Sequence, residues 1–130
     1  MNPARTHPLP GAMKAVQCTK IRAIGEALIK SGYCSLDAQA NALGLPRSTT
    51  WTILKGCHKS SGLSATVLSR MLASPKLPAL VRTELVQYVE EKAAGRYGDS
   101  AAKLRKFKMR LDGALAYYET KRAVAGGRRS

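Results

Sequence analysis

The chain contains few acidic residues: 8 Asp and Glu stand against 22 Lys and Arg among 130 residues, for a formal charge of +14 at pH 7. Before residue 84 the acids are Glu26 and Asp37 alone. Five further cations crowd into residues 103–110. An excess of one sign on this scale predicts a polyanionic partner, with nucleic acid favoured over an anionic membrane surface.

Cysteine is also scarce, with three residues and no Cys-x-x-Cys pair. Cys57 and His58 are adjacent but lack the second ligand pair of a zinc site, so we expect no metal and no cofactor, and thiols that pack as small apolar groups. No apolar stretch approaches the ~20 residues that cross a bilayer. The proline-containing N-terminus does not have the pattern of a secretory signal. These features predict a cytoplasmic protein without a membrane partner.

Catalysis is the least favoured class of function. The sequence shows no nucleophile–base pairing, no phosphate-binding glycine loop and no cluster of metal ligands. Its two histidines, His7 and His58, fall in expected non-helical segments without a carboxylate neighbour. We therefore predict no catalytic residues and no enzyme activity.

The composition favours an all-α fold, because aromatic residues make up 5% of the chain while Ala, Leu, Lys and Arg dominate. Apolar spacing predicts helices over about 19–31, 35–44, 46–56, 65–73, 78–94 and 99–124. Ser35 and Ser64 are expected N-caps, and Gly44 an expected left-handed turn. In the first helix one apolar face is expected to comprise Ile21, Ile24, Leu28 and Ile29.

The expected domain organisation has four parts. Residues 1–15 form a flexible arm, 16–76 a DNA-binding domain, 77–125 a helical extension for packing or dimerisation, and 126–130 a flexible tail. The last helix is long and basic. Its apolar stripe is expected to pack within the chain or pair with a second subunit, and comprises Leu104, Phe107, Leu111 and Leu115. Its cations are expected to make supplementary phosphate contacts, through Lys103, Lys106, Lys108 and Arg110.

The centre of the chain predicts two short helices joined at Gly44, the second with a polar outer face. That face carries a cation, hydroxyls and one flat ring, and comprises Arg47, Ser48, Trp51, Thr52 and Lys55. A core position for Trp51 beneath the fourth helix is the alternative. Phosphate contacts are expected from the start of the first of these helices and from the following loop, at Ser35, Lys59, Ser60 and Ser61, with a solvated turn as the alternative for the loop.

A motif in this segment resembles the Xre family of λ-repressor-like helix-turn-helix regulators. The pattern is Ala40-x3-Gly44-x8-Ile53, with Arg-Ser-Thr after the turn and Lys-Gly at the end of the helix. The similarity covers roughly 21–77, and departs from the family at Gln39 and Leu54. It implies a helical bundle whose third helix lies in the major groove, with base contacts from Arg47, Ser48, Trp51, Thr52 and Lys55.

The sequence thus predicts a sequence-specific regulator of transcription, of bacterial or phage type. We expect its recognition helix, about 46–55, to bind double-stranded DNA, as a homodimer on a pseudo-palindromic site. Two alternatives stay open. One is an RNA-binding protein that uses the basic last helix, and the other is a helix-turn-helix adaptor or antitoxin that acts through a second protein.

Overall fold

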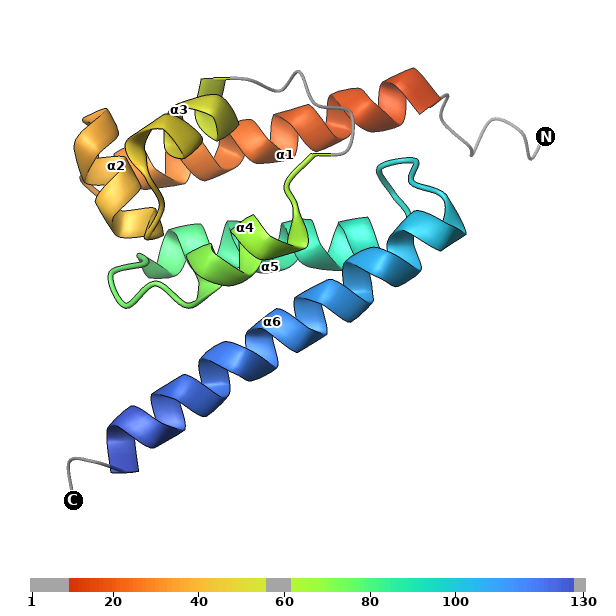
Figure 1. Cartoon of the computed structure of the whole chain (residues 1–130). Helices are drawn as coiled ribbons and strands as arrows, with labels where there is room; N and C mark the ends of the chain where they lie inside the picture. Colours follow the sequence, from red (N-terminus) through yellow and green to blue (C-terminus); the bar gives the residue numbers. More distant parts are fainter. Residues whose placement is uncertain (1–9, 56–61, 128–130) are drawn as a thin grey trace.

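The computed structural model of the chain describes residues 10–55 and 62–127, with side chains up to 121. These residues form six helices and no strand, which confirms the predicted all-α class (Figure 1). The helices are α1 (Pro10–Lys30), α2 (Leu36–Leu43), α3 (Arg47–Lys55), α4 (Ala65–Leu72), α5 (Ala79–Ala93) and α6 (Ala101–Gly127).

The helix ends follow the capping residues of the sequence. The Ser35 hydroxyl accepts a hydrogen bond from the Ala38 N–H at 3.1 Å, and the Ser64 hydroxyl accepts one from the Val67 N–H at 3.2 Å. Each bond satisfies a donor that has no partner inside its own helix. Gly44 ends α2 in the left-handed region, with φ of 69°. Both predicted N-caps and the predicted turn are confirmed.

Both terminal helices are longer than the sequence analysis predicted. α1 begins at Pro10 rather than near Thr19, so residues 10–15 of the expected flexible arm are helical. Proline suits the first position of a helix, because its missing N–H would have had no partner there. At the other end α6 continues to Gly127, which places Gly126 and Gly127 of the expected tail inside a helix.

The predicted apolar face of α1 is wrong at one position. Ile21, Ile24 and Leu28 are buried, but Ile29 is 54% exposed. Successive residues of a helix are about 100° apart, so Ile29 turns away from the face that Leu28 occupies. Gln17, which is only 2% exposed, extends the buried face toward the N-terminus instead.

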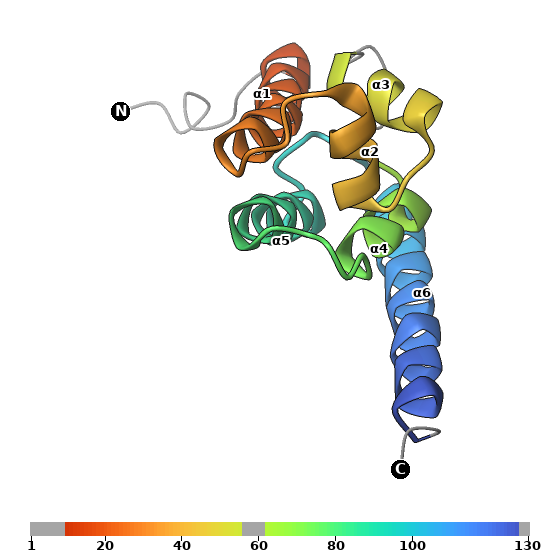
Figure 2. The same ribbon diagram turned by 90° about the vertical axis from the view of Figure 1, so that its left-hand side faces the viewer.

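The helices pack around one core. α1 lies along α5, α2 and α3 cover the end of α1, and α4 lies between α5 and α6 (Figures 1 and 2). Fully buried side chains from five of the helices meet in the core, among them Ile24, Leu43, Leu68, Met71 and Leu85. The C-terminal half of α6 extends beyond this body (Figure 2).

The apolar stripe of α6 packs within the chain. Phe107 and Leu111 are 8% and 5% exposed, and they join the same core as α4 and α5. Leu115 is partly buried against that core, and Leu104 is also half-buried. The stripe therefore anchors the N-terminal half of α6 to the rest of the chain.

Replacing Leu111 tests this anchoring. Leu111→Ala should lower the free energy of unfolding by about 2–5 kcal/mol, because it removes buried methyl groups and leaves a cavity. Urea denaturation followed by circular dichroism measures the change. Met109→Ala is the matched control on the same helix, because Met109 is 75% exposed, and should change stability by no more than about 0.5 kcal/mol. Equal effects of the two substitutions would contradict the packing of the stripe.

Candidate nucleic-acid interface

α3 has one buried face and one exposed face. Thr50 is fully buried, and its hydroxyl donates to the Pro46 carbonyl at 3.0 Å, which allows a polar residue to pack in the core. Ile53 and Leu54 are half-buried on the same side. The opposite face is exposed to solvent.

The predicted base-contacting residues lie mainly on the exposed face. Arg47, Ser48, Trp51 and Lys55 are exposed, and Thr52 is partly buried. The Thr52 hydroxyl donates to the Ser48 carbonyl at 3.0 Å, within the helix. The structure thus brings four of the five residues to one surface, with Thr52 at its edge.

Trp51 resolves the alternative that the sequence left open. Its side chain is 53% exposed, so it is not a core residue beneath α4. It lies one helical turn from Arg47 and one turn from Lys55. A flat apolar ring between two cations is a surface that can contact sugars and thymine methyl groups.

The turn between α2 and α3 is held by Ser74, which lies two residues after the end of α4. The Ser74 hydroxyl donates to the Ala42 carbonyl at 2.7 Å, in the last turn of α2, where carbonyls lack intrahelical partners. A Cβ added at Gly44 would lie 3.2 Å from the Ser74 Cβ, so the turn and Ser74 approach closely. Sequence reasoning missed Ser74, because nothing in its local pattern shows that it reaches α2.

Gln39 also fixes the position of α2, although in the Xre family that this segment resembles an apolar residue is usual at this position. Its side chain is 9% exposed, and its amide nitrogen donates to the Tyr33 carbonyl at 3.0 Å. The buried amide is therefore satisfied by the turn that precedes α2.

Arg47 makes an ion pair that the sequence did not predict. Its Nε lies 3.3 Å from Asp37 Oδ1, and the two side chains are 68% and 78% exposed. A pair this exposed contributes only about 0–1 kcal/mol, so an incoming guanine or phosphate can replace the carboxylate at little cost.

Of the residues predicted to contact phosphate at the start of α2 and in the loop after α3, the structure describes only Ser35. Ser35 is exposed at the start of α2, where its hydroxyl oxygen caps the helix. Its contact with phosphate stays a prediction. Lys59, Ser60 and Ser61 lie outside the described residues.

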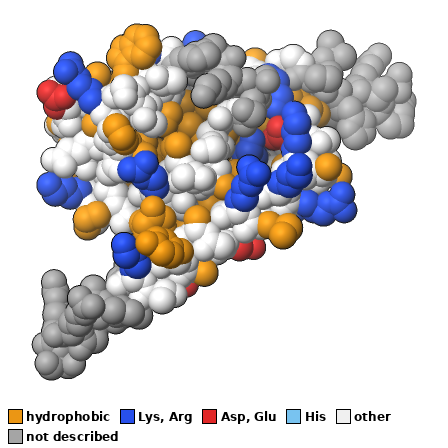
Figure 3. All heavy atoms as spheres, viewed as in Figure 1, with side chains coloured by type: hydrophobic (Ala, Val, Ile, Leu, Met, Phe, Trp, Pro, Cys, Tyr) orange, Lys and Arg blue, Asp and Glu red, His pale blue; other side chains and the backbone are white. Residues whose placement is uncertain are grey.

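The predicted supplementary phosphate contacts divide between two faces of α6. Lys103, Lys106, Lys108 and Arg110 are all exposed. Lys103, Lys106 and Arg110 line one pocket, and Lys108 does not. The side of the molecule formed by α3, α4 and α6 carries many Lys and Arg side chains and few acidic ones (Figure 3).

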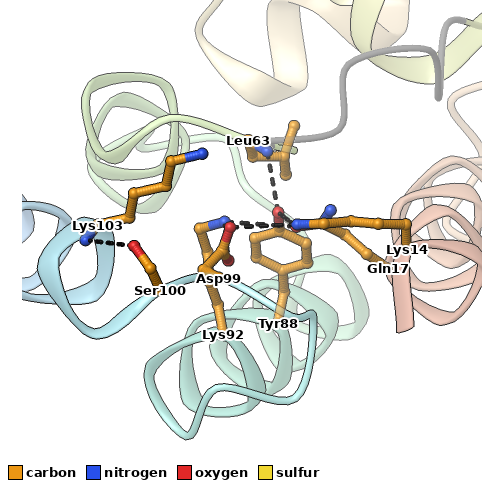
Figure 4. Close-up of polar contacts among 8 residues, drawn as sticks. All are labelled: Lys14, Gln17, Leu63, Tyr88, Lys92, Asp99, Ser100 and Lys103. Carbon is orange, nitrogen blue, oxygen red and sulfur yellow. Dashed lines mark hydrogen bonds and ion pairs between the residues drawn. The ribbon is translucent and has the colours of Figure 1, made fainter. Parts of the chain in front are cut away.

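A buried polar cluster holds the elements behind this surface (Figure 4). The Asp99 carboxylate, 5% exposed, accepts hydrogen bonds from Lys14 Nζ at 3.2 Å and from Lys92 Nζ at 3.0 Å. The Tyr88 hydroxyl donates to Gln17 Oε1 at 2.8 Å and accepts from the Leu63 N–H at 2.9 Å. These bonds join α1, α5, the turn before α6 and the chain that enters α4.

Burial and pairing set the protonation of this cluster. Burial favours a higher pKa for Asp99, but the hydrogen bonds from Lys92 and Lys14 outweigh it and hold the pKa below the ordinary value. Burial lowers the pKa of Lys92, with Asp99 opposing the shift. Burial also raises the pKa of Tyr88, so its hydroxyl stays neutral and can both donate and accept.

Asp99 lies two residues before α6 but does not cap it. The capping acceptor is Ser100, whose hydroxyl receives the Lys103 N–H at 3.3 Å. This leaves the Asp99 carboxylate for Lys14, 85 residues earlier. No local signal reveals a partner at that separation.

Two of the three cysteines differ from the expected packed thiols, and Cys57 lies outside the described residues. Cys18 is disulfide-bonded, and Cys34 has a free thiol that is exposed. Spacing could not predict this, because disulfide formation depends on which cysteines the fold brings together.

Comparison of the chain with protein-family models, with curated proteins and with solved structures found no match. No described helix combines the length and the apolar character needed to cross a membrane. The part of the chain that the structure describes contains no group of three or more His, Cys, Asp or Glu placed to hold a metal ion.

Replacing Asp99 tests the buried cluster. Asp99→Asn should lower the free energy of unfolding by about 3–5 kcal/mol, because it removes the charge that faces the buried Lys92 ammonium. Asp112→Asn, at an exposed position of α6, is the matched control and should change stability by no more than about 0.5 kcal/mol.

The same variant should alter the acid dependence of stability. Because the pKa of Asp99 is below 3.8 in the folded chain, the folded state binds fewer protons than the unfolded state as the pH approaches that value. The stabilisation is present above pH 3.8 and is lost as the pH falls through the lowered pKa. Denaturation measured from pH 6 downward should show a smaller acid loss in Asp99→Asn than in the unmodified chain. Parallel curves would contradict a stabilising role for the carboxylate.

Proposed function

We propose that the chain is a sequence-specific regulator that binds duplex DNA, with α2 and α3 acting as a λ-repressor-like helix-turn-helix unit. The observation that carries this proposal is the exposed face of α3. Arg47, Ser48, Trp51 and Lys55 all face solvent from a helix whose other side is packed in the core. A net charge of +14 supplies the attraction to a polyanion.

The dimensions of α3 suit the major groove. An α-helix with its side chains is about 10–12 Å across. The groove is about 12 Å wide and admits one α-helix, whose N-terminal residues contact the base edges. Arg47 lies at that end of α3 and can present a bidentate pair of donors to guanine once it leaves Asp37.

Rigid support of α3 favours base reading over a purely electrostatic role. Hydrogen bonds to base edges require a helix held at a fixed angle, since small displacements break them. Here Ser74 clamps the turn that precedes α3, and Leu54 on α3 lies against Gly25 of α1. We infer that the chain acts by binding rather than by catalysis.

The proposal includes a homodimer on a site with two half-sites about 10 bp apart. The interface would lie outside Phe107 and Leu111, because the chain buries both in its own core. The projecting half of α6 leaves exposed side chains such as Tyr117, at 57% exposure, for contact with a second copy.

Selection of binding sites from random duplexes, followed by Arg47→Ala, tests the assignment. The substitution should reduce discrimination at one or two base pairs by about 1–3 kcal/mol, because it removes a bidentate contact. Binding to unrelated duplexes should change little. Competition binding with single-base variants of the selected site measures both effects.

Arg105→Ala is the control, because Arg105 is exposed on α6 and its loss removes the same charge. It should leave base discrimination unchanged. Equal weakening on every duplex by Arg47→Ala would show that Arg47 contacts only the backbone. A preference for structured RNA that survives Arg47→Ala would overturn the DNA-binding function itself.

A further inference from the structure

We propose that a second phosphate-binding site lies between the start of α4 and the first turns of α6, and that it takes a phosphate of the duplex backbone beside the segment read by α3. The residues that form it are Lys103, Lys106 and Arg110. This inference rests on the proposed function and specifies where the duplex runs over the protein.

The three cations share one face of α6, and the fold sets that face against the start of α4. Positions 103, 106 and 110 are three and four residues apart, so they recur on one face of α6. They line a pocket of about 270 Å³ together with Ser64 and Ala65 at the start of α4. Figure 4 shows the Lys103 side chain extending from α6 toward α4.

The positive charge of this pocket is not neutralised from within the described part of the chain. None of its described carboxylates forms an ion pair with Lys103, Lys106 or Arg110. Asp99 also lines the pocket, but its carboxylate is 5% exposed and already accepts from Lys14 and Lys92. Like charges held this close repel one another unless an anion lies among them.

Phosphate fits this chemistry better than a carboxylate does. A phosphodiester offers oxygens in several directions, and the pocket offers two flexible ammonium groups and one forked guanidinium. The Ala65 and Thr66 N–H groups at the start of α4 add donors at the same place, because within the described part of the chain neither has an acceptor, whereas the Val67 and Leu68 N–H groups donate to Ser64.

The pocket lies on the same side of the molecule as α3. In Figure 1 α3, α4 and α6 are on the near side, and in Figure 2 all three lie on the right, away from α1 and α5. Lys and Arg side chains gather on this side in Figure 3. A duplex seated on α3 would therefore continue across the pocket, where its backbone supplies the phosphate.

Two double variants with equal loss of charge test the site. Lys106→Ala/Arg110→Ala removes one lysine and one arginine from the pocket. Lys76→Ala/Arg105→Ala removes the same pair of residue types from outside the pocket, where both are exposed. Fluorescence anisotropy of a labelled duplex over a series of salt concentrations gives the affinity and its salt dependence for each chain.

The pocket variant should bind the duplex about 10-fold more weakly at moderate salt. Its log–log salt slope should fall by about 0.9, the change for one lost phosphate contact. The control variant should retain the affinity and slope of the unmodified chain. Equal effects of the two variants would show that these cations act only through diffuse charge, and would overturn the site, as would no effect of either.

A titration with inorganic phosphate distinguishes a pocket that binds a phosphate of the duplex backbone from one that binds a free phosphate compound. Amide shifts at Ala65 in an NMR spectrum report occupation of the pocket. Phosphate-dependent shifts that vanish in Lys106→Ala/Arg110→Ala, together with weaker duplex binding by that variant, support the proposal. The same shifts with unchanged duplex binding would assign the pocket to a free phosphate compound and overturn the backbone contact.

These measurements also keep the two proposals apart. If site selection returns no preferred sequence, the hypothesis that α3 recognises bases is wrong. The difference in salt slope between the two double variants still tests whether the pocket binds a backbone phosphate. If selection yields a preferred sequence and the two variants bind alike, the phosphate site in the pocket is wrong, and base recognition by α3 is still supported.

Discussion

The structure depends on the buried Asp99 carboxylate, which two lysines approach from different helices. Lys14 comes from α1 and Lys92 from α5, while Asp99 itself lies just before α6. A carboxylate and two ammonium groups inside a protein are costly unless they meet with good geometry. Next to them, Tyr88 connects Gln17 of α1 to the Leu63 N–H, directly before α4. The cluster therefore orients four segments relative to one another.

The internal ion pairs add to the basic character that the outer surface already has from 22 Lys and Arg against 8 acids. The acids that the structure places inside or against the body are used in pairing, as Asp99 is with Lys14 and Lys92, and as Glu84 and Glu91 are with Lys20. Among the described residues, no acid forms an ion pair with the cations of the first turns of α6. The paired acids thus stabilise the folded core, while unpaired cations stay available on the side of the molecule that includes α3.

Local features of the sequence predicted the helices well and the contacts between them poorly. Ser35, Gly44 and Ser64 act within a few residues of their own positions, so their roles follow from capping and turn chemistry. The expected flexible arm over 1–15 was wrong from Pro10 onward, because proline both ends helices and begins them and so does not by itself distinguish the two. Ile29 was misplaced because an apolar residue at the edge of a helical stripe can lie inside or outside, depending on what packs there.

The amino-acid order was sufficient for the helical class, for most helix boundaries and for the outward face of α3, since each depends on spacing or on neighbours along the chain. The meeting of Lys14 with Asp99, the reach of Ser74 to Ala42 and the convergence of Lys103, Lys106 and Arg110 on the start of α4 depended on the fold. Contacts across such separations form only when helices cross at particular angles. Those angles come from the packing of the whole core, which no single segment encodes.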